Sequence, residues 1–106
     1  MGQIAHSRAD VASPSDCAGV VEAVMKQWGR LDILVNNVGL GGAEGTAVEV
    51  DDEEWRRGMD INVLSMVLMS KYAIPQMLRT SPSDISRGTG KAIVNMSSIA
   101  GMQGGK

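Results

Sequence analysis

Three short polar segments of this 106-residue chain carry the side chains best suited to chemistry. They are Asp10-Val11, Asn36-Asn37-Val38-Gly39 and Ser97-Ser98, and each comes at the end of a stretch that we expect to be a strand. A hydroxyl at a strand end can donate to the carbonyl oxygen of a substrate and stabilise the charge that develops there. A glycine lets the backbone pass close to a ligand where a Cβ would collide. These segments are therefore the candidate functional residues.

A fourth polar residue, Asn62, interrupts the apolar face of a long predicted helix. The helix is expected from Asp51 to Met77, with Glu54 three residues after Asp51 in a relation like that of a capping box. Apolar residues continue along it at helical spacing: Trp55, Met59, Val63, Met66, Val67, Ile74 and Met77. On the sequence alone, the Asn62 amide either turns to solvent or serves a specific partner.

The elements that must position these residues alternate between strands and helices. Continuous apolar runs at Leu31–Val35 and Lys91–Met96 favour strands that are covered on both faces, and Ile4–Val11 is expected to be a further short strand. A helix is expected from the Ser13-Pro14-Ser15-Asp16 turn as far as Gly29, with a polar loop between residues 80 and 90. The helix expected before Gly29 carries an apolar face formed by Val20, Val21, Val24, Met25 and Trp28. This order predicts a parallel α/β sheet with right-handed crossovers, in which ligands bind at the carboxyl ends of the strands.

Composition excludes several classes of function. A net charge of −2 and a pI of about 5.2 give no electrostatic reason to expect nucleic acid. No apolar run approaches the roughly 20 residues that cross a bilayer, and no signal core opens the chain. The single cysteine, Cys17, rules out an internal disulfide, and its position in an amphipathic helix favours a structural over a nucleophilic role. We therefore expect a cytoplasmic protein with no membrane partner and no metal site.

Four segments together resemble the short-chain dehydrogenase/reductase family. Leu31–Gly39 resembles the fourth strand and NNAG turn of that family, with Val38 in place of the usual alanine. Asp60-Ile61-Asn62-Val63 resembles the part of the long helix that holds a catalytic asparagine. Ile93–Gly101 resembles the fifth strand with its active-site serine, and Asp10-Val11 the pair after strand three. The similarity covers essentially the whole chain, and the four matches occur in the order that the family has. One NNxG tetrapeptide would be weak evidence for the family, but four ordered matches are strong evidence.

The resemblance implies a hydride transfer between NAD or NADP and a small alcohol or ketone substrate. It makes Ser98 the catalytic serine, because Ser98 lies three residues before Gly101, and makes Ser97 structural. It also makes Asn62 a catalytic residue whose side chain anchors a water. The implied cofactor-binding residues are Asp10, Val11, Asn36, Asn37 and Gly39. An alternative for the two asparagines is that they simply form a turn.

Two parts of the family pattern have no match in residues 1–106. Gly39, Gly41, Gly42 and Gly45 do not satisfy the spacing of a TGxxxGxG turn and follow the wrong strand. Tyr72 does not fit the YxxxK motif of the proton donor, because residue 76 is Gln76. The prediction is an incomplete, doubly wound Rossmann domain that contains the equivalents of strands three, four and five, inactive alone. The alternative is a catalytically dead truncated paralogue, acting at most as an interaction module, and the long helix is the expected oligomer face of the full enzyme.

Overall fold

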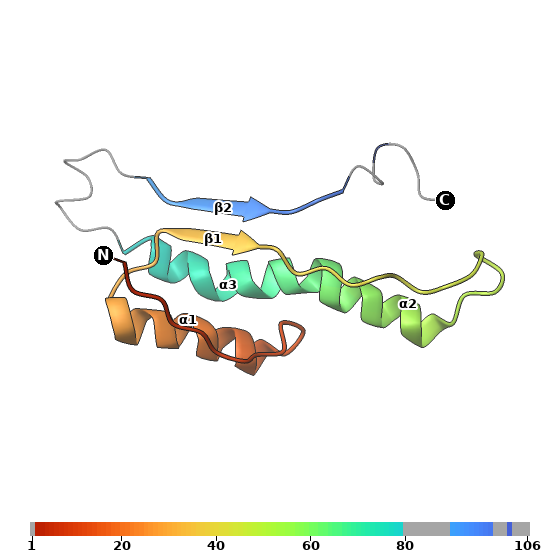
Figure 1. The fold of residues 1–106 in the computed structure, drawn as a ribbon, viewed down its shortest axis with the longest axis horizontal. Helices are drawn as coiled ribbons and strands as arrows, with labels where there is room; N and C mark the ends of the chain where they lie inside the picture. The colour runs from red at the N-terminus through yellow and green to blue at the C-terminus, as the bar shows by residue number, and fades with distance from the viewer. Residues whose placement is uncertain (1, 80–89, 99–101, 103–106) are drawn as a thin grey trace.

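The computed structural model describes residues 2–79, 90–98 and 102. The elements run in the order α1 (Pro14–Trp28), β1 (Ile33–Asn36), α2 (Asp52–Met59), η1 (Asp60–Leu64), α3 (Ser65–Met77) and β2 (Ala92–Asn95) (Figure 1). Residues 80–89 of the expected loop and Ile99-Ala100-Gly101 of the predicted motif lie outside the described residues. None of the helices in the described part of the chain is long and apolar enough to cross a membrane.

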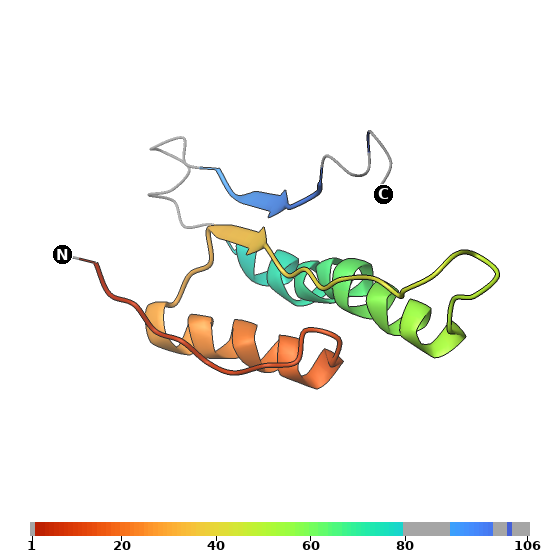
Figure 2. The same ribbon diagram turned by 45° about the vertical axis from the view of Figure 1, so that its right-hand side comes forward.

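The two strands form a parallel pair, as predicted. Ile33 is in register with Ala92 and Asn36 with Asn95, so both carboxyl ends lie at the same edge of the sheet. The long helical segment connects them, and its α3 part packs against β1 (Figure 2). This arrangement is the crossover unit expected of a partial Rossmann fold, because a parallel pair needs a long connection that returns the chain to the same end.

Helix α1 begins and ends at the residues that the sequence indicated. The Ser13 hydroxyl accepts a hydrogen bond from the Asp16 N–H at 3.3 Å, and Pro14 occupies the first turn, where its missing N–H costs nothing. At the other end Gly29 has φ of 70° and donates its N–H to the carbonyl of Met25. A left-handed residue closes the helix there, which glycine adopts without steric cost.

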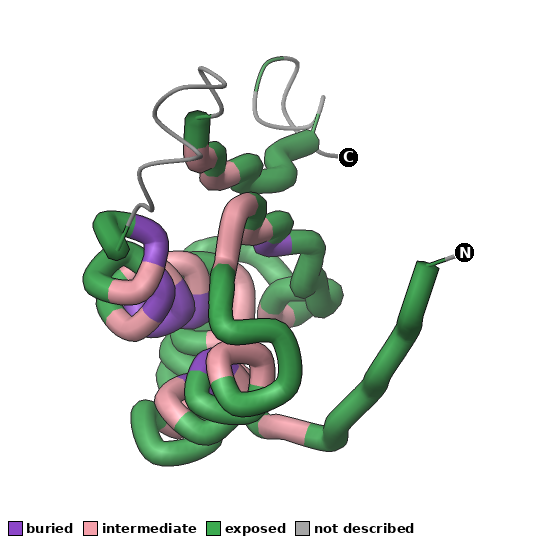
Figure 3. The backbone as a smooth tube through the Cα atoms, turned by 90° about the vertical axis from the view of Figure 1, so that its left-hand side faces the viewer, coloured by how far each residue is buried: buried purple, intermediate pink, exposed green. Residues whose placement is uncertain are grey.

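The expected strand at Ile4–Val11 is wrong. Residues 2–10 have no regular secondary structure, and the side chain of Ile4 is 95% exposed. The segment runs alongside α1 (Figure 1), and Figure 3 colours most of it as exposed. A strand needs a neighbour to receive its backbone hydrogen bonds, and the only strands among the described residues, β1 and β2, pair with each other.

The long helix is not one uninterrupted α-helix, which corrects the prediction for Asp51–Met77. Asp51 caps it as expected, since its carboxylate accepts the N–H of Glu54 at 3.0 Å. The five residues of η1, however, form a π-helical segment between α2 and α3. Widened turns of this kind often occur at functional sites, and this one contains Asn62.

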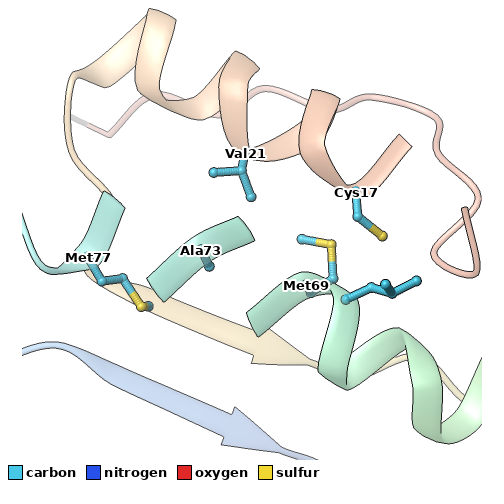
Figure 4. Packing of buried hydrophobic residues seen from close by; sticks show 6 residues of the cluster. Cys17, Val21, Met69, Ala73 and Met77 are labelled. Carbon is cyan, nitrogen blue, oxygen red and sulfur yellow. The ribbon is translucent and has the colours of Figure 1, made fainter. Parts of the chain in front are cut away.

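The hydrophobic core lies between α1 and α3. Figure 4 shows side chains from the two helices directed toward one another, and the buried apolar residues are Cys17, Val21, Leu68, Met69, Ala73 and Met77. Much of the apolar face expected on the long helix points outward instead: Trp55, Met59, Val63, Val67 and Ile74 are exposed. The helix is apolar on more than one side, so spacing alone did not identify the face that packs on α1.

Candidate functional site

The carboxyl ends of β1 and β2 are joined by a pair of asparagines. Asn36 is buried, and its Nδ2 donates to Oδ1 of Asn95 at 2.9 Å. The two residues are register partners, so the side-chain bond continues the backbone ladder at the point where both strands end. Asn36 therefore fixes the separation of the two segments that carry Asn37 and Ser98.

The residues that follow β1 form an exposed loop. Asn37 and Gly39 are both exposed, and no atom lies within 4 Å of the position that a Cβ on Gly39 would take. A ligand can thus approach the Gly39 backbone closely. Ser98 is also exposed and lies three residues beyond Asn95, the last residue of β2.

Asn62 is bound to this loop through both polar groups of its side chain. The Leu40 N–H donates to Oδ1 of Asn62 at 2.7 Å, and Nδ2 of Asn62 donates to the Leu40 carbonyl at 2.9 Å. Both contacts are made to the backbone of the residue that follows Gly39. Asn62 connects the long helix to the candidate cofactor-binding turn.

The π-helical segment has its own hydrogen-bonding pattern. The N–H of Ser65 donates to the carbonyl of Asp60, five residues earlier, instead of to that of Ile61. The Ser65 hydroxyl, which is buried, donates to the Ile61 carbonyl at 2.6 Å. A serine at this position thus satisfies a carbonyl that the widened turn would otherwise leave without its usual backbone donor.

Asp10 and Val11 form a tight turn before α1. The Oδ1 atom of Asp10 accepts the N–H of Ala12 at 2.9 Å, and the Asp10 N–H donates to Oδ2 of Asp16 at 2.8 Å. Val11 packs against the core. A cleft lined in part by Asp10, Ala12 and Ile61 opens between this turn and the start of the long helix, so the turn faces the helix segment that carries Asn62.

Cys17 is unsuited to nucleophilic chemistry. Its side chain is fully buried and donates to the Val11 carbonyl at 3.3 Å. Burial, followed by the negative charges of Asp16 and Asp10, raises the pKa of the Cys17 thiol. The thiolate is the reactive form, so this environment favours the structural role. No group of three or more potential metal ligands occurs among the described residues.

At the opposite end of the strands a charged cluster holds the sheet. Asp32 accepts two hydrogen bonds from the Arg30 guanidinium, both at 2.8 Å, and a further bond from Lys91. These partners, Arg30 first, hold the pKa of the Asp32 carboxyl well below its usual range. The Asp32 carbonyl also accepts the N–H of Ala92. The cluster lies away from the candidate site and positions β2 beside β1.

Sequence reasoning missed three of the residues that build this edge: Leu40, Ser65 and Asn95. For Asn95 a signal existed, because both strands end in the same pair of letters, Val-Asn. Leu40 acts through its backbone, so its residue type carried no signal.

Comparison with known proteins identifies the family. The short chain dehydrogenase family model matches residues 1–106. The chain belongs to the short-chain dehydrogenases. A cyclohexanol dehydrogenase of Acinetobacter sp. (strain SE19) is 33% identical over 103 residues, which are 97% of this chain and 38% of that protein. This short-chain dehydrogenase chain thus spans less than half the length of the curated relatives it matches.

Solved structures agree with the fold. An NADH-dependent reductase, A1-R', complexed with NAD superimposes with a TM-score of 0.81 at 32% identity, covering 94% of this chain and 40% of that one. The protein ElxO with NADP bound gives a TM-score of 0.76 at 29% identity, covering 93% and 37%. The two strands and four helical segments (α1, α2, η1 and α3) in the described part of this short-chain dehydrogenase therefore form part of a Rossmann fold.

Proposed function

We propose that this chain forms part of an NAD- or NADP-dependent oxidoreductase that transfers a hydride between nicotinamide and an alcohol or carbonyl substrate. The observation that carries the proposal is the family match over residues 1–106. It is supported by two similar structures whose names record NAD in one and NADP in the other. The substrate class is supported by the alcohol dehydrogenases among the relatives, such as the cyclohexanol enzyme.

The turn before α1 and the loop after β1 carry the residues that we propose for the adenosine side of a dinucleotide. In the part of the chain that the structure describes, Oδ2 of Asp10 has no hydrogen-bond partner, so it can accept from the amino group of an adenine. Asn37 and Gly39 are exposed, and Gly39 leaves its backbone open to a ribose or phosphate. Val11 supports the turn from the core, and Asn36 holds the strand ends together.

The nicotinamide group would supply or receive the hydride when bound. Ser98 is the proposed catalytic serine, because a hydroxyl at this edge can donate to the substrate oxygen as negative charge develops on it. Asn62 is proposed to act by holding the turn at Leu40, one residue beyond Gly39. The role of Ser98 rests on its match to the family motif, and that of Asn62 on its two hydrogen bonds to Leu40.

The proton that accompanies hydride transfer needs a further group. The single tyrosine, Tyr72, packs against the core from α3, with Lys71 5.6 Å from the centre of its ring. A core position favours packing over proton transfer at the sheet edge, so we propose that residues 1–106 are inactive by themselves. A cytoplasmic location is also proposed, and the free thiol of Cys17 supports it.

A second candidate is a non-catalytic interaction module or, in the full enzyme, an oligomer face on the long helix. The exposed side chains of Trp55, Met59, Val63 and Val67 favour such a contact. Light scattering coupled to size-exclusion chromatography tests it: Val63→Glu with Val67→Glu should lower the molecular mass of the assembly. An unchanged mass would reject this face.

The main proposal is tested on the complete protein encoded by the gene. Codons in frame on either side of residues 1–106 are read for a TGxxxGxG turn and a YxxxK motif, and oxidation of NADH and NADPH is followed over a panel of ketones. Turnover with one cofactor supports the proposal. Both motifs present without cofactor binding or turnover would contradict it, while frame-breaking codons would favour the truncated paralogue.

A further inference from the structure

The loop after β1 lies against the long helix where the helix has no side chain. Gly58 in α2 is buried, and a Cβ built on it would lie 3.8 Å from the Cα of Gly42. The loop runs back along the helix from the end of β1 toward α2 (Figure 1). Backbone therefore meets backbone at this crossing, with room for one further carbon atom.

This contact and the Asn62 contact lie on one face of the helix. Gly58 and Asn62 are four residues apart, and both line one cavity together with Gly42 of the loop. Four helical residues rise about 6 Å, and the two residues from Leu40 to Gly42 span at most about 7 Å. The loop can therefore lie along the helix with Leu40 on Asn62 and Gly42 on Gly58. The length of loop between the two contacts matches the length of helix between them.

We propose that Gly58 is a positioning residue for the candidate cofactor-binding turn. Its missing side chain sets the height of the loop above α2, and this height brings the Leu40 backbone within reach of both polar groups of Asn62. The inference deepens the proposed function and rests on it, because the turn that is held contains Asn37 and Gly39. Gly58 itself touches no ligand.

The geometry distinguishes a small substitution from a larger one. An alanine Cβ at residue 58 makes an ordinary van der Waals contact at 3.8 Å. A β-branched side chain adds two atoms beyond the Cβ, and in a helix its χ1 angle is largely fixed. Since the Cβ already contacts Gly42, we expect the added atoms to meet the loop backbone and to raise it from the helix.

The test compares Gly58→Val and Gly58→Ala in the complete protein. Hydrogen–deuterium exchange is measured for peptides that contain Leu40, whose N–H donates to Asn62. Gly58→Val should increase exchange at Leu40 about tenfold, as expected for the loss of one hydrogen bond, and should weaken cofactor binding. Gly58→Ala should leave both unchanged. Gly19→Val is the matched control, because Gly19 is an exposed helical glycine with no atom within 4 Å of a Cβ.

Each result decides the question. Unchanged protection of the Leu40 N–H from exchange in Gly58→Val would overturn the proposal. A loss of protection in Gly58→Ala as large as that in Gly58→Val would overturn it too. Increased exchange with unchanged cofactor affinity would reject the positioning role. If Gly58→Val does not fold, Gly58→Thr is used, and unfolding of both would place Gly58 in the core and overturn the proposal. Lack of cofactor binding by the unsubstituted protein would reject the proposed function while leaving the exchange result interpretable.

Discussion

At the scale of single residues, two amide side chains hold the candidate site together. Asn36 joins the ends of two strands, and Asn62 joins the long helix to the loop after β1. Their partners lie 59 and 22 residues away in sequence. Each net hydrogen bond contributes only about 1 kcal/mol, so the importance of these pairs lies in the geometry that they fix.

Ser98 provides the sharpest residue-level prediction. In the complete enzyme Ser98→Ala should lower turnover roughly 10²–10³-fold, the usual cost of removing a donor to a developing oxyanion. Steady-state kinetics with a saturating cofactor measures the change. Ser97→Ala is the matched control and should retain most of the activity, because Ser97 is the neighbouring hydroxyl assigned a structural role. Equal effects of the two substitutions would refute the assignment of Ser98.

The sequence identified the polar residues of this edge but not their partners. Asn62 stood out because an amide interrupts an apolar helix face, while its partner is a backbone group in a loop. A backbone partner leaves no trace in residue types. The Asn36–Asn95 bond needed the strand register, which the sequence does not state directly.

At the scale of elements, local signals were reliable and non-local ones were not. The limits of α1 followed from a serine cap and a glycine, both of which act on neighbouring residues. The failed strand at Ile4–Val11 depended on a partner that its own sequence cannot reveal. The π-helical segment was missed because one widened turn scarcely alters the apolar spacing.

The cap of α1 yields a stability prediction. Gly29→Ala should destabilise the complete protein by about 1 kcal/mol, because φ of 70° places an alanine Cβ close to the following carbonyl oxygen. Urea unfolding measures this loss. At Gly19, inside the same helix and exposed, alanine should instead stabilise by up to about 1 kcal/mol. A stabilising Gly29→Ala would show that the left-handed cap is unnecessary.

The Asp32 cluster predicts a pH-dependent contribution to the pairing of β1 and β2. Because the folded state lowers the pKa of Asp32, its contribution is fully present above the unfolded value of about 4 and is lost as pH falls toward the folded value. In the complete protein, Asp32→Asn should therefore lower the Tm near neutral pH, and its difference in Tm from the unsubstituted protein should narrow below about pH 4. The effect should be modest, because the Asp32 side chain is 38% exposed.

A matched variant separates this effect from loss of a charge. Glu22→Gln removes one exposed carboxylate from α1, and its Tm difference should be smaller at neutral pH. Thermal melts of the three proteins between pH 3 and pH 7 provide the comparison, using the range over which carboxyl groups titrate. A difference for Asp32→Asn that stays constant across this range would rule out linkage to the Asp32 carboxyl.

At the scale of the whole molecule, the chain exposes more surface than a self-contained domain. Its accessible surface is 8275 Å², against about 5,700 Å² for a folded monomer of this mass. The radius of gyration is 17.0 Å, against about 13 Å for a compact domain of this length. Both strands contribute to the excess, since Ile33, Val35 and Val94 are each more than 40% exposed.

These dimensions lead to the prediction that residues 1–106, made alone, are marginally stable and have no dehydrogenase activity. Six buried apolar side chains form the described core, and the open strand edges invite association. Cofactor binding would stabilise the fold only if the cofactor made enough contacts with it. The residues proposed for cofactor binding would contact only the adenosine part of the dinucleotide. The purified chain should therefore melt without a cooperative transition, show no shift with NAD or NADP, and leave alcohols and ketones unchanged. A cooperative melt that rises with cofactor, or turnover above a buffer blank, would show that this one crossover unit holds a dinucleotide without the rest of a Rossmann sheet.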